Sequence, residues 1–81
     1  MADDDYPIKK QLDATGLTCP EPVMLLHKAM REIAHGECVE VIATDPSTQR
    51  DIPKFCQFLR HGLLRQEVAQ DKFIFLLRKG G

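Results

Sequence analysis

Cys19 is the residue of this 81-residue sequence whose type and setting point most directly to chemistry. It is followed by Pro20, Glu21 and Pro22, and then by a stretch with helical periodicity. Proline suits the first turn of a helix, because its missing N–H is not needed there and its φ is already about −65°. The pattern predicts a helix that begins at Pro20, with Cys19 as the N-cap or its immediate neighbour.

A thiol at a helix start faces the positive end of the helix dipole, which favours the thiolate and lowers the thiol pKa. The thiolate is the nucleophile of sulfur exchange, so this position suits sulfur transfer. Glu21 places a negative charge nearby, and the two prolines remove backbone donors, so we expect only a modest depression of the pKa of Cys19. We expect the prolines to rigidify the turn and to hold the sulfur outward.

The other two cysteines have settings typical of packing. Cys56 lies on the apolar face of a predicted helix, between Phe55 and Leu59, and we expect it to be buried. Cys38 shares strand parity with Glu40, so we expect partial exposure there, but no neighbouring residue would activate it. No CxxC or HxxxH spacing is present, and we expect no metal site.

A strand and a helix would have to position Cys19. The strand is predicted at residues 10–14, with Leu12 and Ala14 on one side, and Gly16 supplies the turn that follows it. The helix after this turn carries an apolar stripe at three- and four-residue steps, formed by Val23, Leu26, Met30 and Ile33.

Four further elements complete the predicted domain. Residues 38–43 are rich in β-branched side chains and indicate a buried strand. A second helix is predicted to begin near Pro53, after a looser turn over residues 48–51, and to end at Gly62. Alternating residues at 63–68 and 72–78 predict two more strands.

The predicted order, β-α-β-α-β-β, favours an α+β fold. Each amphipathic helix needs a sheet face to cover its stripe, and a chain this short supplies one sheet. We expect a two-layer α/β sandwich with a four-stranded mixed sheet and both helices on one face. The right-handed crossover rule makes strands one and two parallel. We expect residues 1–9 to form a flexible N-terminal tail and residues 10–81 to form the single domain.

The composition excludes several functional classes. A content of 43% hydrophobic and 28% charged residues is typical of a globular domain and not of a disordered chain. The net charge of −1 lacks the basic excess of nucleic-acid-binding proteins, so we expect no direct nucleic-acid contact. Neither a secretory signal nor a membrane span is evident. We expect a cytoplasmic protein, without membrane association, whose three cysteines are reduced.

The segment LDATGLTCPEPVM, from Leu12 to Met24, resembles the TusA (SirA-like) family of small sulfur carriers. The signature of this family is CPxP after a short strand and a Gly-containing turn. The resemblance continues nearly to the C-terminus, through Asp45-Pro46, the RDIP segment at 50–53, Phe55-Cys56 and the final RKGG. It implies the same βαβαββ sandwich.

The resemblance also implies a sulfurtransferase that carries a persulfide on Cys19, without a cofactor of its own. Gly16, Pro20, Glu21 and Pro22 would form the supporting motif. In this family a cysteine desulfurase loads the carrier, which passes the sulfane sulfur to a downstream sulfur-relay protein. The end product is 2-thiouridine at the tRNA wobble position, and members also supply molybdenum-cofactor assembly. The family's second helical cysteine corresponds to Cys56 and is not the carrier.

Such a carrier needs an exposed sulfur and a surface that docks two partners in turn. We expect a monomer whose docking residues lie beside the thiol and near the second helix. The candidates are Met24, His27, Arg31, Arg50, Asp51 and Phe58.

Two other functions stay open from the sequence. In one, the protein is a non-catalytic interaction or regulatory module, and the CPxP motif is only a rigid helix cap. In the other, it is a thiol redox or selenium-related relative. Redox cycling would require Cys38 or Cys56 to approach Cys19, because no cysteine lies two residues from it.

Overall fold

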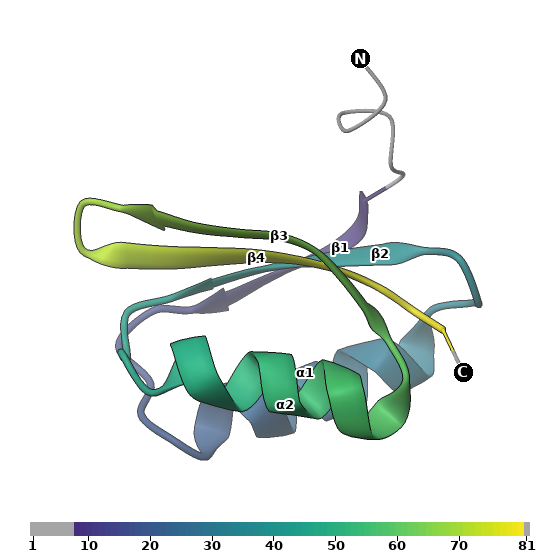
Figure 1. The fold of residues 1–81 in the computed structure, drawn as a ribbon, viewed down its shortest axis with the longest axis horizontal. Coiled ribbons are helices and arrows are strands. Elements are labelled where there is room, and N and C mark those ends of the chain that lie inside the picture. Colours follow the sequence, from purple (N-terminus) through teal and green to yellow (C-terminus); the bar gives the residue numbers. More distant parts are fainter. Residues whose placement is uncertain (1–7, 81) are drawn as a thin grey trace.

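The computed structural model describes residues 8–80, which form four strands and two helices. In chain order these elements are β1 (Ile8–Ala14), α1 (Glu21–Glu32), β2 (Cys38–Ala43), α2 (Thr48–Leu59), β3 (Gly62–Ala69) and β4 (Lys72–Arg78). Both helices lie on one face of the sheet (Figure 1). The predicted α+β sandwich is therefore confirmed. Neither helix in the described part of the chain is long and apolar enough to cross a membrane.

The strand order places the ends of β1 and β2 side by side. The sheet has the order β1-β2-β4-β3, in which β1 and β2 are parallel, as the crossover through α1 predicts, and β4 is antiparallel to both of its neighbours. The register sets Ala14 opposite Ala43, so the two parallel strands end at the same level. The loops that follow them therefore meet, and they build the candidate site.

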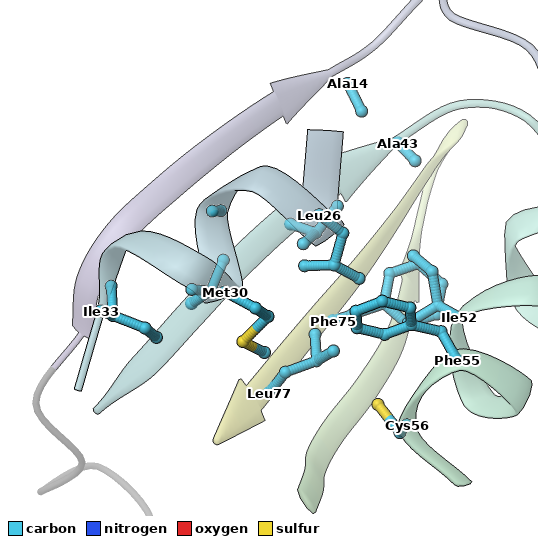
Figure 2. Close-up of a cluster of buried hydrophobic side chains, with 13 residues drawn as sticks. Ala14, Leu26, Met30, Ile33, Ala43, Ile52, Phe55, Cys56, Phe75 and Leu77 are labelled. Atoms are coloured by element: carbon cyan, nitrogen blue, oxygen red, sulfur yellow. The ribbon is translucent and has the colours of Figure 1, made fainter. Parts of the chain in front are cut away.

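A single hydrophobic cluster fills the space between the sheet and the helices. Leu26 and Met30 enter it from α1, Ile52 and Phe55 from α2, and Phe75 from β4 (Figure 2). All five side chains are at most 5% exposed. Because both helices pack on the same cluster, this core fixes the position of α1 relative to α2.

The N-terminal boundary of β1 differs from the prediction. Ile8 and Lys9, which we assigned to a flexible tail, are the first residues of the strand, because Ile8 pairs with Cys38. Residues 1–7 of that predicted tail lie outside the described residues.

The predicted start of the second helix is also wrong. Helix α2 begins at Thr48, and Pro53 lies inside it. The first turn closes without the proline, since the N–H groups of Arg50 and Asp51 both donate to the Ser47 carbonyl, at 3.0 and 2.9 Å. The Thr48 hydroxyl also donates to the Asp45 carbonyl at 2.7 Å. Proline removes only its own donor, and these bonds hold the preceding turn.

Helix α2 ends at Leu59, earlier than the predicted stop at Gly62. Arg60 adopts the left-handed conformation, with φ 61°, and the N–H of His61 bonds to the Cys56 carbonyl at 2.9 Å. This cap closes the helix with a non-glycine residue, and Gly62 becomes the first residue of β3 instead.

Candidate functional site

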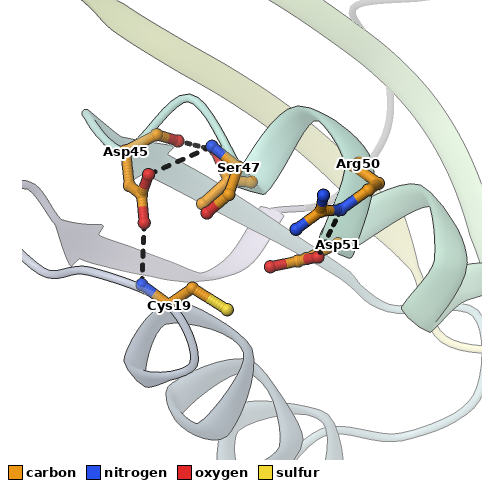
Figure 3. Close-up of polar contacts among 6 residues, drawn as sticks. Cys19, Asp45, Ser47, Arg50 and Asp51 are labelled. Atoms are coloured by element: carbon orange, nitrogen blue, oxygen red, sulfur yellow. Dashed lines mark hydrogen bonds and ion pairs between the residues drawn. The ribbon is translucent and has the colours of Figure 1, made fainter.

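Cys19 lies in the loop that joins β1 to α1, beside the loop that follows β2 (Figure 3). Helix α1 begins at Glu21 with Pro20 as its N-cap, one residue later than predicted, so Cys19 immediately precedes the cap. The Cys19–Pro20 peptide bond is cis. Pro22, in the first turn, is buried, whereas Cys19 is exposed and its thiol is free. The CPxP segment thus anchors one proline in the core and presents the sulfur to solvent.

The turn before Cys19 depends on Gly16. This residue has φ 80°, a conformation that side chains other than glycine rarely adopt, although an added Cβ would meet no atom within 4 Å. Its N–H donates to Thr44 Oγ1 at 2.8 Å, which ties the turn to the end of β2. The backbone conformation, not a lack of space, therefore requires glycine here.

Asp45 fixes the backbone of Cys19. Its Oδ2 accepts a hydrogen bond from the Cys19 N–H at 2.7 Å, and its Oδ1 accepts one from the Ser47 N–H at 3.0 Å (Figure 3). The bond from Ser47 and then the bond from Cys19 hold the pKa of the Asp45 carboxyl below its ordinary value. One carboxylate therefore links the loop before α1 to the first turn of α2.

We expect Asp45→Asn to destabilise the protein at neutral pH and to make little difference in acid. A carboxyl whose pKa is lowered by folding stabilises the fold above its unfolded pKa of about 3.9, and that contribution is lost as the pH falls through the folded value. Urea unfolding at neutral pH should give the variant a lower midpoint, and the two midpoints should converge as the pH falls through the lowered pKa of the folded protein. Asp71→Asn, at the exposed turn before β4, is the matched control for the loss of one charge. A midpoint difference that persisted unchanged in acid would contradict this role of Asp45.

The first turns of α2 bring two more polar groups to the sulfur. Asp51 and Ser47 both face Cys19, and Arg50 Nε contacts the far oxygen of the Asp51 carboxylate, Oδ1, at 3.2 Å (Figure 3). The hydrogen-bonding contact of the Cys19 thiol with the Asp51 carboxyl raises the pKa of this thiol above its ordinary value of 9.0. Partial desolvation and the negative charges of Asp51 and Asp45 raise the pKa further, whereas the Ser47 hydroxyl acts in the opposite direction.

The predicted depression of the Cys19 pKa is therefore wrong. That prediction considered the dipole of the helix that Cys19 precedes. The two carboxylates that raise the pKa come from a loop and a helix that are distant from Cys19 in the sequence.

An open pocket of about 450 Å³ lies beside Cys19. Its walls are mainly apolar and come from both helices. The lining residues are Cys19, Pro20, Val23, His27, Asp51, Lys54, Phe55, Phe58 and Leu59. The His27 ring, which lines the pocket, stands edge-on to the Phe55 ring, with 4.7 Å between centroids.

Most of the predicted docking residues surround this pocket. His27, Asp51 and Phe58 line it together with the thiol, and Arg50 is held beside them by its ion pair with Asp51. Met24, in the first turns of α1, is 62% exposed. Glu21 of the motif is exposed in the first turn of the same helix. Arg31 lies in the last turn of α1, at the far end of the helix from Cys19.

Three polar residues of the site, Asp45, Ser47 and Lys54, were not among the predicted site residues. Asp45 and Ser47 follow β2, and the parallel pairing of β1 with β2 could have placed their loop next to Cys19, because parallel strands end at the same edge of a sheet. Lys54, which lines the pocket, carries no comparable signal in the sequence, since an exposed lysine on a helix is usually solvated.

The other cysteines are inaccessible. Cys38 is 0% exposed and Cys56 is 4% exposed. The predicted partial exposure of Cys38 is wrong, because β2 is a central strand flanked at this position by Ile8 and Arg78. Burial raises the pKa of the Cys38 thiol, and it raises the pKa of Cys56 to about 11. Of the three cysteines, all within residues 8–80, Cys19 alone can meet another protein's thiol.

Metal ligands do not gather in the described residues. No three His, Cys, Asp or Glu side chains between residues 8 and 80 lie close enough together to hold a metal ion.

Known proteins resemble this chain over most of its length. The family model described as "Sulfurtransferase TusA" matches residues 10–79. The sulfur carrier protein TusA of Pseudomonas entomophila is 62% identical over 68 residues, which cover 84% of this chain and 85% of that protein. A sulfur carrier protein TusA of Pseudomonas putida is 60% identical over 75 residues, covering 93% of this chain and 94% of that protein.

A solved structure shares the fold. The SirA-like protein from Desulfitobacterium hafniense superposes with a TM-score of 0.77 at 20% sequence identity, covering 89% of this chain and 99% of that protein. The family match and the identities above concern the same stretch of chain that carries the exposed CPxP cysteine. This chain therefore belongs to the TusA family of sulfur-carrier proteins.

Proposed function

We propose that Cys19 accepts a sulfane sulfur from a cysteine desulfurase as a persulfide and passes it to a downstream sulfur-relay protein in the cytoplasm. The observation that carries this proposal is the accessibility of the three thiols, of which only that of Cys19 is exposed, at the mouth of a pocket. By resemblance to the family, the sulfur is destined for 2-thiolation of the tRNA wobble uridine, and for molybdenum-cofactor assembly in addition.

Loading is a thiol exchange at the outer sulfur of the donor's persulfide. The Cys19 thiolate attacks this sulfur, a new S–S bond forms, and the S–S bond of the donor breaks. The donor's cysteine leaves as a thiolate, and the product is Cys19–S–SH. Delivery repeats the exchange, because a thiolate of the acceptor attacks the outer sulfur and Cys19 leaves as a thiolate. Atoms and electrons balance in both steps without an external oxidant or reductant.

The direct test maps the added sulfur. The full chain, incubated with a cysteine desulfurase and cysteine and then freed of small thiols, should gain about 32 Da for one sulfur atom. Peptide mass spectrometry should place this sulfur on the peptide that contains Cys19. An unchanged mass, or sulfur on the peptides of Cys38 or Cys56, would contradict the proposal.

A docking role for Phe58 gives a second prediction. Its ring is 85% exposed and lines the pocket next to the thiol, so it can enter an apolar recess of a partner. We expect Phe58→Ala to lower the efficiency of loading by the desulfurase about 5- to 30-fold, mainly through a higher KM for the carrier, as truncation of an interface anchor does.

Two controls make this prediction specific. Val68→Ala removes another exposed apolar side chain, 64% exposed on β3, and should load like the wild type. A small-molecule persulfide donor requires no docking, so Phe58→Ala should load from it at the wild-type rate. If Phe58→Ala lowered the efficiency of loading equally with both donors, Phe58 would act on the thiol or on the fold instead of on docking.

A further inference from the structure

Two buried polar atoms beside Cys19 have no hydrogen-bond partner of standard geometry in residues 8–80. They are Asp51 Oδ2 and Ser47 Oγ. Such atoms are rare in folded proteins, because a buried polar group that is left unpaired destabilises the fold. Both atoms come from the start of α2, and both face the sulfur (Figure 3). In the unloaded protein the Cys19 thiol contacts both groups, but neither contact has the geometry of a standard hydrogen bond.

The carboxylate of Asp51 is held in this orientation by its neighbour. Arg50 Nε contacts Oδ1 at 3.2 Å, which leaves Oδ2 directed at Cys19. An ionised carboxylate only accepts hydrogen bonds, whereas a hydroxyl both donates and accepts. The outer atom of a persulfide, S–SH, offers one S–H donor together with sulfur lone pairs. An S–H donor suits the Asp51 carboxylate, and sulfur lone pairs suit the Ser47 hydroxyl as a donor.

We propose that the Asp51 carboxylate accepts a hydrogen bond from the outer S–H of the loaded Cys19 persulfide, and so keeps this sulfur protonated until an acceptor attacks it. The Ser47 hydroxyl donates to the same sulfur from the other side. The assignment rests on the proposed function, since it concerns the loaded form of Cys19.

Protonation decides whether the outer sulfur can be handed on. The anion –S–S⁻ repels an attacking thiolate and is itself a nucleophile, so it reacts with electrophiles. The neutral –S–SH is the form whose outer sulfur is attacked. A persulfide is a stronger acid than the corresponding thiol, and a nearby carboxylate that accepts its S–H opposes ionisation. The same influence is visible on the unloaded thiol, whose pKa Asp51 raises.

Other charged or titratable groups around the sulfur come from each neighbouring element. They are Glu21 and His27 on α1, Asp45 in the loop after β2, and Arg50 and Lys54 on α2. The Asp45 carboxylate is occupied by two backbone N–H groups, and Arg50 is engaged by Asp51. Asp51 Oδ2 faces the thiol, is buried, and has no hydrogen bond of standard geometry.

Asp51 is a positioning residue in this scheme and exchanges no proton. When an acceptor thiolate attacks, a bond forms to the outer sulfur, the S–S bond to Cys19 breaks, and Cys19 leaves as a thiolate. The S–H proton travels with the transferred sulfur. The Cys19 thiolate then takes a proton from water, which its raised pKa favours.

The test compares two reactions of the loaded protein that depend on protonation in opposite ways. Wild type and Asp51→Asn are loaded with a cysteine desulfurase and cysteine, and the bound sulfur is quantified by mass. The rate of alkylation by iodoacetamide then reports the anionic form of the persulfide. The rate at which added cyanide is converted to thiocyanate reports attack on the outer sulfur. At neutral pH we expect the variant to be alkylated about three- to tenfold faster and to release thiocyanate more slowly by a similar factor, because one pKa unit is a tenfold change in the ratio of the two forms.

Three further measurements separate this assignment from a structural effect. The pH midpoint of alkylation should fall in Asp51→Asn. Asp51→Glu retains the negative charge, so its rates of alkylation and of thiocyanate release should both stay close to those of the wild type. Ser47→Ala removes a donor to the anion and should slow alkylation, in the direction opposite to Asp51→Asn. If the wild type takes up no sulfur on Cys19, the proposed function itself fails. If it loads, and Asp51→Asn leaves both rates unchanged or moves them in the same direction, the role of Asp51 is overturned and the carrier function stands.

Discussion

Cys19→Ser is expected to take up no sulfur from a cysteine desulfurase, with residual loading below about one part in a hundred of the wild type. A serine hydroxyl does not form a persulfide, and the remaining thiols of Cys38 and Cys56 are 0% and 4% exposed. Intact mass spectrometry after incubation with the desulfurase and cysteine provides the measurement. The fold should be retained, since the Cys19 side chain is exposed and the two oxygens of Asp45 bind backbone groups.

The matched controls are Cys38→Ala and Cys56→Ala, which remove a thiol and leave Cys19 in place. Both change the core, so loading must be expressed per folded molecule, and on that basis we expect it to equal the wild type. Full loading of Cys19→Ser would remove the basis of the sulfur-carrier assignment to this residue. Normal tRNA thiolation in cells that contain only Cys19→Ser would instead favour a regulatory module.

The same three variants address a redox function. A disulfide that involves Cys19 requires a second thiol whose Cα lies within about 7 Å. Cys38 and Cys56 are both buried in the core, so mild oxidation of the wild type should yield no intramolecular disulfide. A disulfide between Cys19 and either residue, detected by peptide mass spectrometry, would support the redox alternative.

The order of the elements could be predicted because its causes are local. The apolar stripe of α1, the β-branched run of β2 and the alternation in β4 each show in a short window of sequence, and each element forms where it was expected. The boundaries of elements were harder to predict where they depend on contacts with other residues of the chain. Ile8 joins β1 because Cys38 lies opposite, and α2 contains Pro53 because bonds to the Ser47 carbonyl hold the preceding turn.

The site was only partly predictable, for a related reason. The position of Cys19 at a helix start follows from the proline after it, and its exposure agrees with the expectation. The pKa of its thiol depends on Asp51 and Asp45. Asp45 lies near Cys19 because the parallel strands β1 and β2 end at the same level, and Asp51 lies near it because α1 and α2 pack on one core. The sign of the shift was therefore beyond any argument from neighbours in the sequence.

Phe75→Ala is expected to lower the free energy of unfolding by about 3–5 kcal/mol, the usual cost of removing a buried aromatic ring. Phe75 lies on the central strand β4, is 0% exposed, and belongs to the cluster that includes Leu26 of α1 and Ile52 of α2 (Figure 2). A domain of this size has a total stability of about 4–12 kcal/mol, so the variant should be unfolded at urea concentrations that the wild type tolerates. Urea unfolding followed by circular dichroism measures the change.

Phe58→Ala is the matched control, because it makes the same substitution at a ring that is 85% exposed, and it should change the stability by less than about 0.5 kcal/mol. The pair separates two uses of phenylalanine in one small domain. Phe75 should affect stability and leave loading per folded molecule unchanged, whereas Phe58 should affect loading by the desulfurase and leave stability unchanged. If the two variants were equally stable, Phe75 could not be the buried ring on which both helices pack. In that case the core would not set the distance between Cys19, which precedes α1, and Asp51, which lies in α2.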